Sequence, residues 1–297
     1  MEQQPSTILS SHKPITKKEG RKKKTRRGAR KRTQNTEKLI ITGTNANGLK
    51  PKKESLNSLL ETDRPQVFMI QETKTKRKNE IQIQGYELFE KPRKGKDGGG
   101  IMIGVRKDIE STPVIVSNCD DGDEVEVLTV EIALKQITIR FLTAYVPQEG
   151  AGEDKINKFY ATLEEEIMKC EQEGCGLVAE FDCNAKLGSE IIEGDPNNMS
   201  ANGKIFWDLL ERRECTVVNM SEECSGTITR SRMKQNKLEE SVLDYVIVNP
   251  IVAPYIASME IDETKSKALT RFKKGIAITS DHNVLTVEIG IIVSKLN

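Results

Sequence analysis

The sequence predicts an α/β sandwich with mixed rather than purely parallel sheets. From Leu39 onward, short apolar runs rich in β-branched residues alternate with Gly, Pro and Asn, which is the pattern of strands. Segments with the helical spacing of apolar residues lie between several of these runs. The runs 126–134 and 137–147 are close enough to form an antiparallel hairpin, with Lys135 and Gln136 at the turn, and such a pair is incompatible with an all-parallel sheet.

Nine apolar runs are predicted to be strands and three segments to be helices. The helical segment 153–174 places Ile156, Phe159, Leu163 and Ile167 along one face, which predicts that this face packs against a sheet. The strands are predicted at 39–49, 67–73, 100–105, 126–134, 137–147, 176–182, 216–220, 241–249 and 284–293, and the helices at 52–63, 153–174 and 201–214.

The composition is that of a globular protein long enough to bury a core. The chain has 297 residues, of which 36% are hydrophobic and 31% are charged. No run approaches the roughly 20 apolar residues of a membrane span, and the N-terminus lacks the apolar stretch of a secretory signal, so an intracellular protein is expected. The six cysteines form no CxxC pair, and two histidines are too few for the usual zinc sites. We expect reduced, mostly structural cysteines.

The net charge of +1 conceals a strongly basic segment near the N-terminus. Residues 13–32 hold twelve Lys or Arg and one Glu, whereas residues 33–297 hold 34 Lys or Arg and 43 Asp or Glu. A block of like charge without apolar periodicity does not fold alone, so residues 1–37 are predicted to be a disordered arm and residues 38–297 one domain. We interpret the arm as a nuclear-import signal or a nucleic-acid tether, with a solubilising tail as the alternative. The expected location is the nucleus.

Polar residues recur where the predicted strands end or begin. In a layered α/β fold, strand ends on one edge line a cleft, so residues distant in sequence converge there. Each motif alone has an ordinary explanation, such as a turn or a helix cap, and it is their order that predicts a site. The candidates are Asn45 and Asn47, Glu72, Tyr145, Asp182 and Asn184, Asp244, and Asp281 with His282.

These candidates belong to a series of motifs that covers about residues 39–290: TNANGL, IQETK, GGGIMI, YVPQ, DCNAKLG, SVLDYVIVN and SDHNVL. The series resembles the endonuclease/exonuclease/phosphatase superfamily, whose members include apurinic/apyrimidinic endonucleases and deoxyribonuclease I. More narrowly, it resembles the endonuclease domain of non-LTR (LINE-type) retrotransposons. The resemblance implies a deoxyribonuclease I-like, four-layered α/β sandwich, in which two packed mixed β-sheets are flanked by helices.

The resemblance also implies a metal-dependent phosphodiesterase. Hydrolysis of a phosphodiester at neutral pH needs charge compensation at the phosphate and an activated water. Mg²⁺ suits such a site because it prefers carboxylate oxygens and retained waters, and Mn²⁺ is expected to substitute. By resemblance, Glu72 is the principal metal ligand, and Asn45 orders that ligand and the metal waters. Asp281 resembles a second carboxylate on the metal side, and Asn47 stands where many relatives carry Asp.

The same resemblance assigns the other candidates to the water and the phosphate. Asp182 resembles the residue that orients or deprotonates the attacking water, and Asn184 resembles an amide that positions the phosphate. Tyr145 matches a tyrosine that stabilises charge on the phosphate or the leaving group. His282 matches the histidine that contacts the scissile phosphate, and Asp244 matches the carboxylate that holds its other ring nitrogen.

Two residues depart from the GDFNA motif that many relatives carry around Asp182. Cys183 replaces the usual Phe, and Glu180 stands where an apolar or small residue would be usual. Catalysis that depends on position responds to backbone shifts of roughly an ångström or less. Neither departure removes a residue with a proposed chemical role, so an active enzyme is expected.

Basic residues cluster in predicted loops near these motifs. The loops are KTKRK, KPRKGK, RSRMKQNK and RFKK, and ordinary solvated loops are the alternative explanation for each of them. Four clusters on an otherwise acidic domain favour contacts with the phosphates of double-stranded DNA. A hairpin that enters a groove is found in relatives at the third cluster. The predicted DNA contacts are Lys91, Arg93, Lys94, Arg230 and Arg232.

The leading hypothesis is an Mg²⁺-dependent endonuclease that nicks one strand of duplex DNA and leaves a 3′-hydroxyl to prime reverse transcription. Its expected partners are double-stranded DNA and a reverse transcriptase domain that this chain does not contain, and no membrane partner is expected. One alternative is an abasic-site repair endonuclease, which would prefer an abasic duplex over an intact one. Another is a DNA-binding copy that has lost catalysis. Cleavage of phosphoinositides or sphingomyelin is the least favoured alternative.

Overall fold

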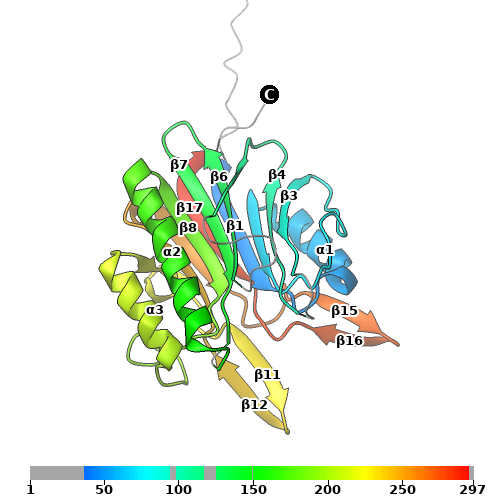
Figure 1. The fold of residues 1–297 in the computed structure, drawn as a ribbon. Helices are drawn as coiled ribbons and strands as arrows, with labels where there is room; N and C mark the ends of the chain where they lie inside the picture. The colour runs from blue at the N-terminus through cyan, green and yellow to red at the C-terminus, as the bar shows by residue number, and fades with distance from the viewer. Residues whose placement is uncertain (1–36, 94–97, 117–124, 149, 294–297) are drawn as a thin grey trace, which may run out of the picture. The chain divides into compact units, whose positions relative to one another are not determined.

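The computed structural model describes residues 37–93, 98–116, 125–148 and 150–293. These residues belong to one compact unit built on two large β-sheets that pack face to face (Figure 1). The predicted arm at residues 1–37, except for Glu37, lies outside the described residues, and so does Lys94. The five cysteines that the structure describes are free thiols. None of the described helices is long and apolar enough to cross a membrane.

The first sheet has seven strands and contributes one half of the predicted site. At its centre, β1 (Glu37–Asn45) pairs antiparallel with β17 (Leu285–Val293) and parallel with β2 (Val67–Gln71). The strand order is β10-β14-β17-β1-β2-β4-β3, with β10 at Cys224–Ser225, β14 at Ile256–Ile261, β4 at Ile101–Arg106 and β3 at Tyr86–Lys91.

The second sheet has six strands and contributes the other half. Within it, β6 (Glu126–Ala133) and β7 (Thr138–Tyr145) form the antiparallel hairpin that the sequence predicts. β7 then pairs parallel with β8 (Gly176–Asp182), and β8 pairs antiparallel with β13 (Asp244–Val248). The strand order is β5-β6-β7-β8-β13-β9, with β5 at Thr112–Val114 and β9 at Thr216–Val217. Both sheets therefore mix parallel and antiparallel pairs.

Three separate groups of buried side chains show that the fold has four layers. Between the sheets, Ile41 of β1 and Val178 of β8 belong to one apolar core. On the outer face of the first sheet, α1 (Lys53–Asp63) buries its leucines against β2 and β4. On the outer face of the second sheet, α2 (Glu153–Glu173) and α3 (Ala201–Arg212) cover β8 (Figure 1). The order helix, sheet, sheet, helices confirms the four-layered sandwich.

The helices on the second sheet follow the predicted pattern. Ile156, Phe159, Leu163 and Ile167 of α2 are all buried, so the face read from the sequence is the face that packs. The helix α2 is closed by a glycine in the left-handed conformation. Ser200 caps the start of α3, because its Oγ accepts a hydrogen bond from the backbone N–H of Gly203, the third residue of the helix. Such caps satisfy backbone groups that the helix itself leaves unpaired.

Successive side chains of β8 point alternately to its two faces, and this places the polar side chains at the end of the strand between the two sheets. Leu177, Ala179 and Phe181 belong to the core under the helices. The intervening residues, including Glu180 and Asp182, therefore face the first sheet. Since this strand ends at Asp182, its last carboxylate reaches the edge where strands of both sheets terminate.

Two ribbons of two strands each extend beyond the sandwich. The first consists of β11 (Arg230–Lys234) and β12 (Lys237–Ser241), and the second of β15 (Thr270–Lys273) and β16 (Ile276–Thr279). In the described part of the chain, each strand of a ribbon pairs only with its ribbon partner, apart from an isolated bridge between Arg230 and the chain near β17. Figure 1 shows both ribbons projecting from the same end of the sandwich. Short 3₁₀ turns at Lys50–Lys52, Val218–Met220 and Ala253–Tyr255 complete the elements.

Candidate active site

The predicted site residues come together at one edge of the sandwich, where strands of both sheets end. The parallel strands β1 and β2 end at Asn45 and Gln71, and the parallel strands β7 and β8 end at Tyr145 and Asp182. A cavity of about 670 Å³ opens at this edge. Six of the predicted catalytic residues line it: Asn45, Glu72, Asp182, Asn184, Asp281 and His282.

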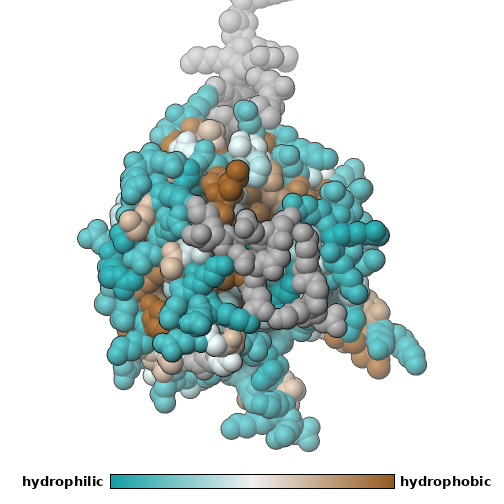
Figure 2. Space-filling view, in the orientation of Figure 1, coloured by the Kyte–Doolittle hydropathy of each residue, from teal (hydrophilic) through white to brown (hydrophobic). Residues whose placement is uncertain are grey.

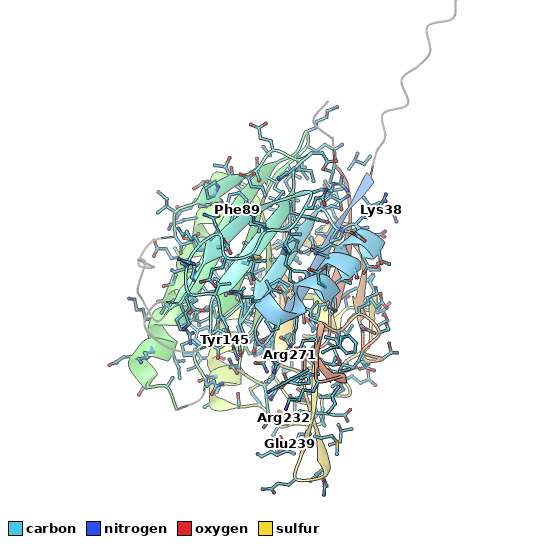
Figure 3. The ribbon with its side chains drawn as sticks, turned by 90° about the vertical axis from the view of Figure 1, so that its right-hand side faces the viewer. Lys38, Phe89, Tyr145, Arg232, Glu239 and Arg271 are labelled. Atoms are coloured by element: carbon cyan, nitrogen blue, oxygen red, sulfur yellow. The ribbon has the colours of Figure 1, made fainter. Side chains whose placement is uncertain are left out.

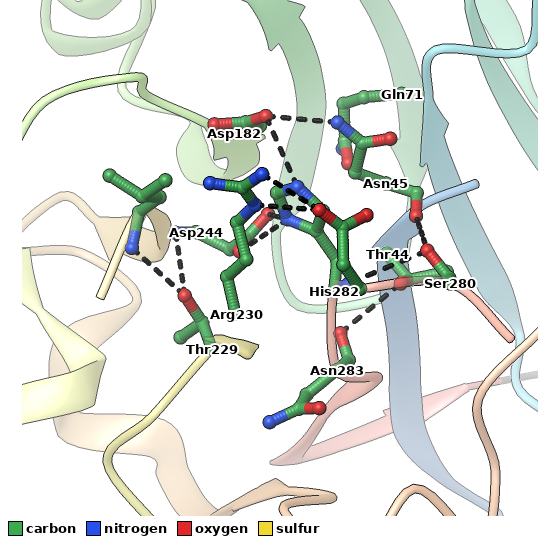
Figure 4. Close-up of polar contacts among 12 residues, drawn as sticks. Thr44, Asn45, Gln71, Asp182, Thr229, Arg230, Asp244, Ser280, His282 and Asn283 are labelled. Atoms are coloured by element: carbon green, nitrogen blue, oxygen red, sulfur yellow. Dashed lines mark hydrogen bonds and ion pairs between the residues drawn. The ribbon is translucent and has the colours of Figure 1, made fainter. Parts of the chain in front are cut away.

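A buried carboxylate holds the imidazole of His282. Both carboxylate oxygens of Asp244 lie 2.9 Å from Nδ1 of His282 (Figure 4). Asp244 is fully buried and His282 is 5% exposed. Burial lowers the pKa of His282, but the charges of Asp244, Asp182 and Asp281 outweigh this and raise the pKa to about 9. The imidazole is therefore a cation at neutral pH.

The position of Asp244 is itself set by side chains from other segments. Oγ1 of Thr229 accepts hydrogen bonds from the backbone N–H groups of Leu243 at 2.9 Å and of Asp244 at 3.0 Å. Nδ2 of Asn219 donates to the carbonyl oxygen of Asp244 at 3.1 Å. The antiparallel pairing of β13 with β8 also places Asp244 opposite Asp182. A carboxylate fixed in this way fixes the ring that it holds.

Asp182 faces the other nitrogen of the same imidazole. Its Oδ2 lies 3.9 Å from Nε2 of His282 and accepts a hydrogen bond of 2.9 Å from Nδ2 of Asn45. Its Oδ1 accepts a hydrogen bond of 3.0 Å from the backbone N–H of Asn184, which has a left-handed φ of 45°. Burial outweighs the opposing charge of His282 and raises the pKa of Asp182 to about 6. Such a carboxylate is mostly ionised at neutral pH and can still accept a proton.

The amide of Asn45 links the two carboxylates that come from different sheets. Besides Asp182, its Nδ2 donates to Oε1 of Glu72 at 3.1 Å. The other oxygen of Glu72, Oε2, lies 3.1 Å from Nζ of Lys74. Lys74 in turn donates to Oδ1 of Asn47 at 2.6 Å, and the backbone N–H of Asn47 donates to Oδ1 of Asn45 at 2.9 Å. The predicted pair Asn45 and Asn47 thus orders the Glu72 side of the cavity.

Tyr145 lies beside the cavity rather than in its wall. It is the last residue of β7 and pairs in register with Asp182 of β8. Burial, together with the charges of Glu72 and Asp182, raises the pKa of Tyr145 to about 12, so the phenol keeps its proton at neutral pH. The guanidinium of Arg93 lies 4.9 Å from the centre of the Tyr145 ring, and Arg93 also forms an ion pair with Glu126.

Asp281 lines the cavity in an ion pair with Arg230. Its Oδ2 lies 2.8 Å from Nε and 2.8 Å from a terminal nitrogen of Arg230. Burial would raise the pKa of Asp281, but His282 and Arg230 lower it below its ordinary value. The carboxylate is therefore ionised, and Arg230 is its basic partner within the protein.

Two of the predicted DNA contacts, Arg230 and Arg232, line the cavity, and three of them, Arg93, Arg230 and Arg232, have acidic partners. Arg232 lines the cavity and pairs with Glu239 across the β11–β12 ribbon at 2.9 Å. Arg93 is held between the Tyr145 ring and an acidic side chain. Lys91 is the last residue of β3, and Lys94 lies outside the described residues.

A second polar layer lies behind the site, and sequence reasoning missed it. Nε2 of Gln71 donates to Oε2 of Glu180 at 2.7 Å and to Oγ1 of Thr143 at 2.8 Å. Glu180 is 1% exposed, and burial raises its pKa well above the ordinary value, which favours the protonated form of this carboxyl. Gly43 leaves the necessary room, because a Cβ at this position would lie 2.2 Å from Cδ of Glu180. The unusual Glu in the motif was the only sequence signal for this layer.

The donors on the Glu72 side of the cavity fit a hard divalent cation. Among the described residues, Asp182, Asp244 and His282 offer ligand atoms within 4.8 Å of one another. However, both oxygens of Asp244 already face a cationic imidazole, and that charge repels a metal ion. Glu72 instead presents a carboxylate that is 18% exposed beside the Asn45 amide. Its cationic neighbour is the ammonium of Lys74, a 37% exposed side chain that would have to leave Oε2 for a metal ion to bind there. Carboxylate oxygens with access to water are what Mg²⁺ prefers.

Solved structures of nucleases share this fold. The endonuclease domain of TRAS1, a telomere-specific non-LTR retrotransposon, has a TM-score of 0.65 at 17% identity over 85% of this chain and 99% of that chain. The AP endonuclease LMAP from Leishmania major has a TM-score of 0.65 at 16% identity over 84% and 88%. The 3′-5′ exonuclease NExo from Neisseria meningitidis has a TM-score of 0.64 at 18% identity over 85% and 100%. The sequence matches no protein-family model and no curated protein. The chain therefore has the fold of these nucleases, a deoxyribonuclease I-like, four-layered α/β sandwich.

Proposed function

We propose that this protein is a metal-dependent DNA endonuclease that hydrolyses a phosphodiester bond in one strand of duplex DNA. The observation that carries the proposal is the single cavity in which a carboxylate-held imidazolium, His282, faces Asp182, while Asn45 joins Asp182 to Glu72. Phosphodiester hydrolysis needs a cation near the phosphate, a base for the water and a site for a metal. In this cavity the cation is His282, the base is Asp182 and the carboxylate for the metal is Glu72.

The proposed metal is Mg²⁺, with Mn²⁺ able to substitute, and its ligand is Glu72, ordered by Asn45. When bound, the ion would supply Lewis acidity and offset charge on the phosphate oxygens. Asp281 is proposed as the second carboxylate of the metal side. Its present partner is Arg230, so it would serve the metal only by exchanging that ion pair for the cation.

The protein's own side chains have separable roles in this chemistry. The imidazolium of His282 stabilises negative charge that develops on the phosphate, and Asp244 keeps that ring charged and oriented. Asp182, with a pKa of about 6, accepts the proton of the attacking water. Tyr145 keeps its proton and donates it in a hydrogen bond to the phosphate or the leaving oxygen. Asn184 positions the phosphate from the adjoining loop.

The nick is proposed to leave a 3′-hydroxyl that primes reverse transcription at the target, as for a non-LTR retrotransposon. This is supported by the motif series of the sequence and by the fold shared with the TRAS1 endonuclease domain, which comes from such an element. The basic arm of residues 1–37 suits a nuclear protein that binds nucleic acid. A reverse transcriptase domain would then be the functional partner.

Repair of abasic sites is the second candidate, and the fold shared with AP endonucleases favours it. The two functions differ in the substrate and not in the hydrolytic groups. A nicking endonuclease cuts intact duplex DNA, whereas a repair enzyme cuts far faster at an abasic position.

The test is a nicking assay on supercoiled plasmid and on a matched oligonucleotide duplex with and without an abasic site. Mg²⁺ should convert the plasmid to relaxed circles, chelation should abolish the conversion, and a DNA polymerase should extend the nicked ends directly. Strong preference for the abasic duplex would replace the first proposal by the second. Binding of DNA without any cleavage in Mg²⁺ or Mn²⁺ would contradict both and indicate a binding protein without catalysis.

A further inference from the structure

The β15–β16 ribbon, residues 270–279, exposes apolar side chains that nothing in the described structure covers. Phe272 is 77% exposed and Ile276 is 68% exposed. Phe272 pairs with Ala277, whereas Ile276 pairs with Lys273, so the two apolar side chains lie on opposite faces of the ribbon. Figure 2 shows the apolar surface on this projection. Neither side chain belongs to any of the three core clusters of the described residues, so both are available to a partner.

The same ribbon carries three cations and no acidic residue. Arg271, Lys273 and Lys274 lie within it, and residues 268–279 contain no Asp or Glu. Within the part of the chain that the structure describes, none of these three side chains has an ion-pair partner. All three can therefore bind an anionic partner without breaking an ion pair within the described structure.

The β11–β12 ribbon, residues 230–241, differs in this respect. Arg230 is paired with Asp281, and both Arg232 and Lys234 lie near Glu239. Each of these cations would have to exchange an internal carboxylate for an external phosphate. Such surface pairs are individually weak, but the β15–β16 cations do not have them at all.

The β15–β16 ribbon is attached directly to the active site. One residue, Ser280, separates β16 from Asp281, and Oγ of Ser280 donates to the carbonyl oxygen of Asn45 at 2.8 Å. At the other strand, the backbone N–H of Thr270 donates to Oγ of Ser55 at 3.1 Å. The base of the ribbon is therefore fixed to the sandwich, while its exposed tip extends away from it.

A second cavity, of about 370 Å³, lies between the two ribbons. Residues 231–233 of β11 line one side, and residues 279–281 line the other. Figure 3 shows Arg271 and Arg232 at the same end of the molecule as Tyr145, away from Lys38. A polymer that crosses the active-site cavity would therefore run beside both ribbons.

We propose that the β15–β16 ribbon is a DNA-binding arm that holds the substrate next to the cleaved bond, and this proposal rests on the proposed nuclease function. Arg271, Lys273 and Lys274 contact phosphates, since each such contact releases counterions from DNA. Phe272 packs against a base, because every base offers a face to an aromatic ring. A base reaches that ring only when it leaves the duplex stack. The arm therefore favours DNA whose bases beside the cleaved bond are unpaired or easily unstacked.

The first experiment measures the salt dependence of binding to a fluorescent duplex by the full chain. The double variant Lys273→Gln, Lys274→Gln should reduce the slope of log affinity against log salt by about 2, because each lost phosphate contact accounts for about 0.9. The matched control is Lys107→Gln, Lys135→Gln, two exposed lysines at the opposite end of the sandwich, after β4 and in the β6–β7 turn. This control should keep the wild-type slope.

The second experiment compares a fully paired duplex with one that has a short unpaired stretch at its centre. Wild-type protein should bind the second DNA more tightly. Phe272→Ala should lose that preference and weaken binding to the unpaired DNA by about 5- to 100-fold, the range for one stacked base, with an unchanged salt slope. The control is Tyr255→Ala, which removes a 46% exposed aromatic ring from the 3₁₀ turn that precedes β14 and does not line the cavity.

The outcomes separate this proposal from the proposed function. If wild-type protein nicks DNA and both ribbon variants bind and discriminate as it does, the arm is elsewhere and only this inference is wrong. If wild-type protein neither binds nor nicks DNA, the nuclease function and the arm are both wrong. Vesicles containing phosphatidylserine serve as a further probe. Loss of vesicle binding in the ribbon variants, with DNA binding intact, would assign the ribbon to a membrane surface instead.

Discussion

Both carboxylate oxygens of Asp244 lie 2.9 Å from Nδ1 of His282, and neither residue is more than 5% exposed. A buried ion pair gains little net stability, because each charge loses its hydration. Its value is geometric: the imidazole is kept in one orientation and kept charged, with Nε2 on the side of Asp182. This relationship between two residues 38 positions apart in sequence underlies the proposed chemistry.

Asp244→Asn tests whether the carboxylate maintains the imidazolium. The amide has the same shape but no charge, so the pKa of His282 should fall below its present value of about 9, and nicking should slow by about 10- to 100-fold. The chain has two histidines, so a His12→Gln background leaves one imidazole for NMR titration. An unchanged pKa in the variant would show that Asp244 has no such role. Asp208→Asn, an exposed substitution in α3, is the control.

Tyr145→Phe tests the phenol as a donor. The phenylalanine ring keeps the packing and the contact with the Arg93 guanidinium but lacks the O–H group. Loss of one preorganised donor should reduce the rate at saturating DNA by about 100-fold or more, with little change in affinity. Single-turnover nicking measures this rate directly. A variant that cleaves as fast as wild type would remove Tyr145 from the reaction.

Glu72→Gln tests the metal assignment. Glutamine keeps an oxygen and the approximate shape of the side chain but loses the charge that a hard cation needs. Calorimetric titration with Mg²⁺ should show weaker binding, and nicking should be lost at low Mg²⁺ and partly recovered at high Mg²⁺. Glu110→Gln, an exposed residue before β5, should change neither result. Equal Mg²⁺ affinity in the Glu72 variant and wild type would place the metal elsewhere.

Glu180→Gln tests, through the pH dependence of stability, whether burial keeps the Glu180 carboxyl behind the site protonated. The folded-state pKa of Glu180 is raised by burial, so the folded protein binds a proton that the unfolded chain releases above its ordinary pKa of 4.5. The stabilisation from this proton is complete below pH 4.5 and is lost as the pH rises toward the folded-state pKa, at about 1.4 kcal/mol per pH unit. Glutamine stays neutral throughout.

Urea unfolding at several pH values measures this difference. The free energy of unfolding of Glu180→Gln, relative to wild type, should rise from acid to neutral pH. Other groups with shifted pKa values, such as Asp182 and His282, are present in both proteins and cancel in the comparison. A difference that stays constant with pH would mean that Glu180 is ionised in the folded protein.

The sequence predicted the central strands and helices of the fold but not its edges. β6, β7 and α2 were predicted because their apolar residues recur with the period of the element that forms. β14 was missed because half of its residues are exposed and it is stabilised by pairing with β17, far away in sequence. The apolar pattern predicted only basic loops at the two ribbons, since strands that bury neither face leave no apolar alternation to detect. The resemblance to known nucleases did place a hairpin at the first of them, where β11 pairs with β12.

In the site, too, the residues of local motifs were predicted, whereas contacts between distant segments were not. Motif order predicted that Glu72, Asp182 and His282 converge, and one cavity contains all three. The ion pair of Asp281 with Arg230 spans 51 positions, and no local pattern encodes it. In the sequence, Glu180 stood out only as an unusual residue in its motif. The room for its side chain is left by Gly43 in the other sheet, and no local pattern predicts that contact.

The most direct measurement of the central claim is plasmid nicking in Mg²⁺ by wild-type protein and by His282→Gln. Wild type should convert supercoiled plasmid to nicked circles, whereas His282→Gln should bind DNA and leave it supercoiled. Because removal of the imidazolium leaves Asp244 as an unpaired buried charge, the double variant Asp244→Asn, His282→Gln serves as a second inactive but folded form. Nicking by either folded variant at close to the wild-type rate would contradict the claim that this imidazole acts on the phosphate.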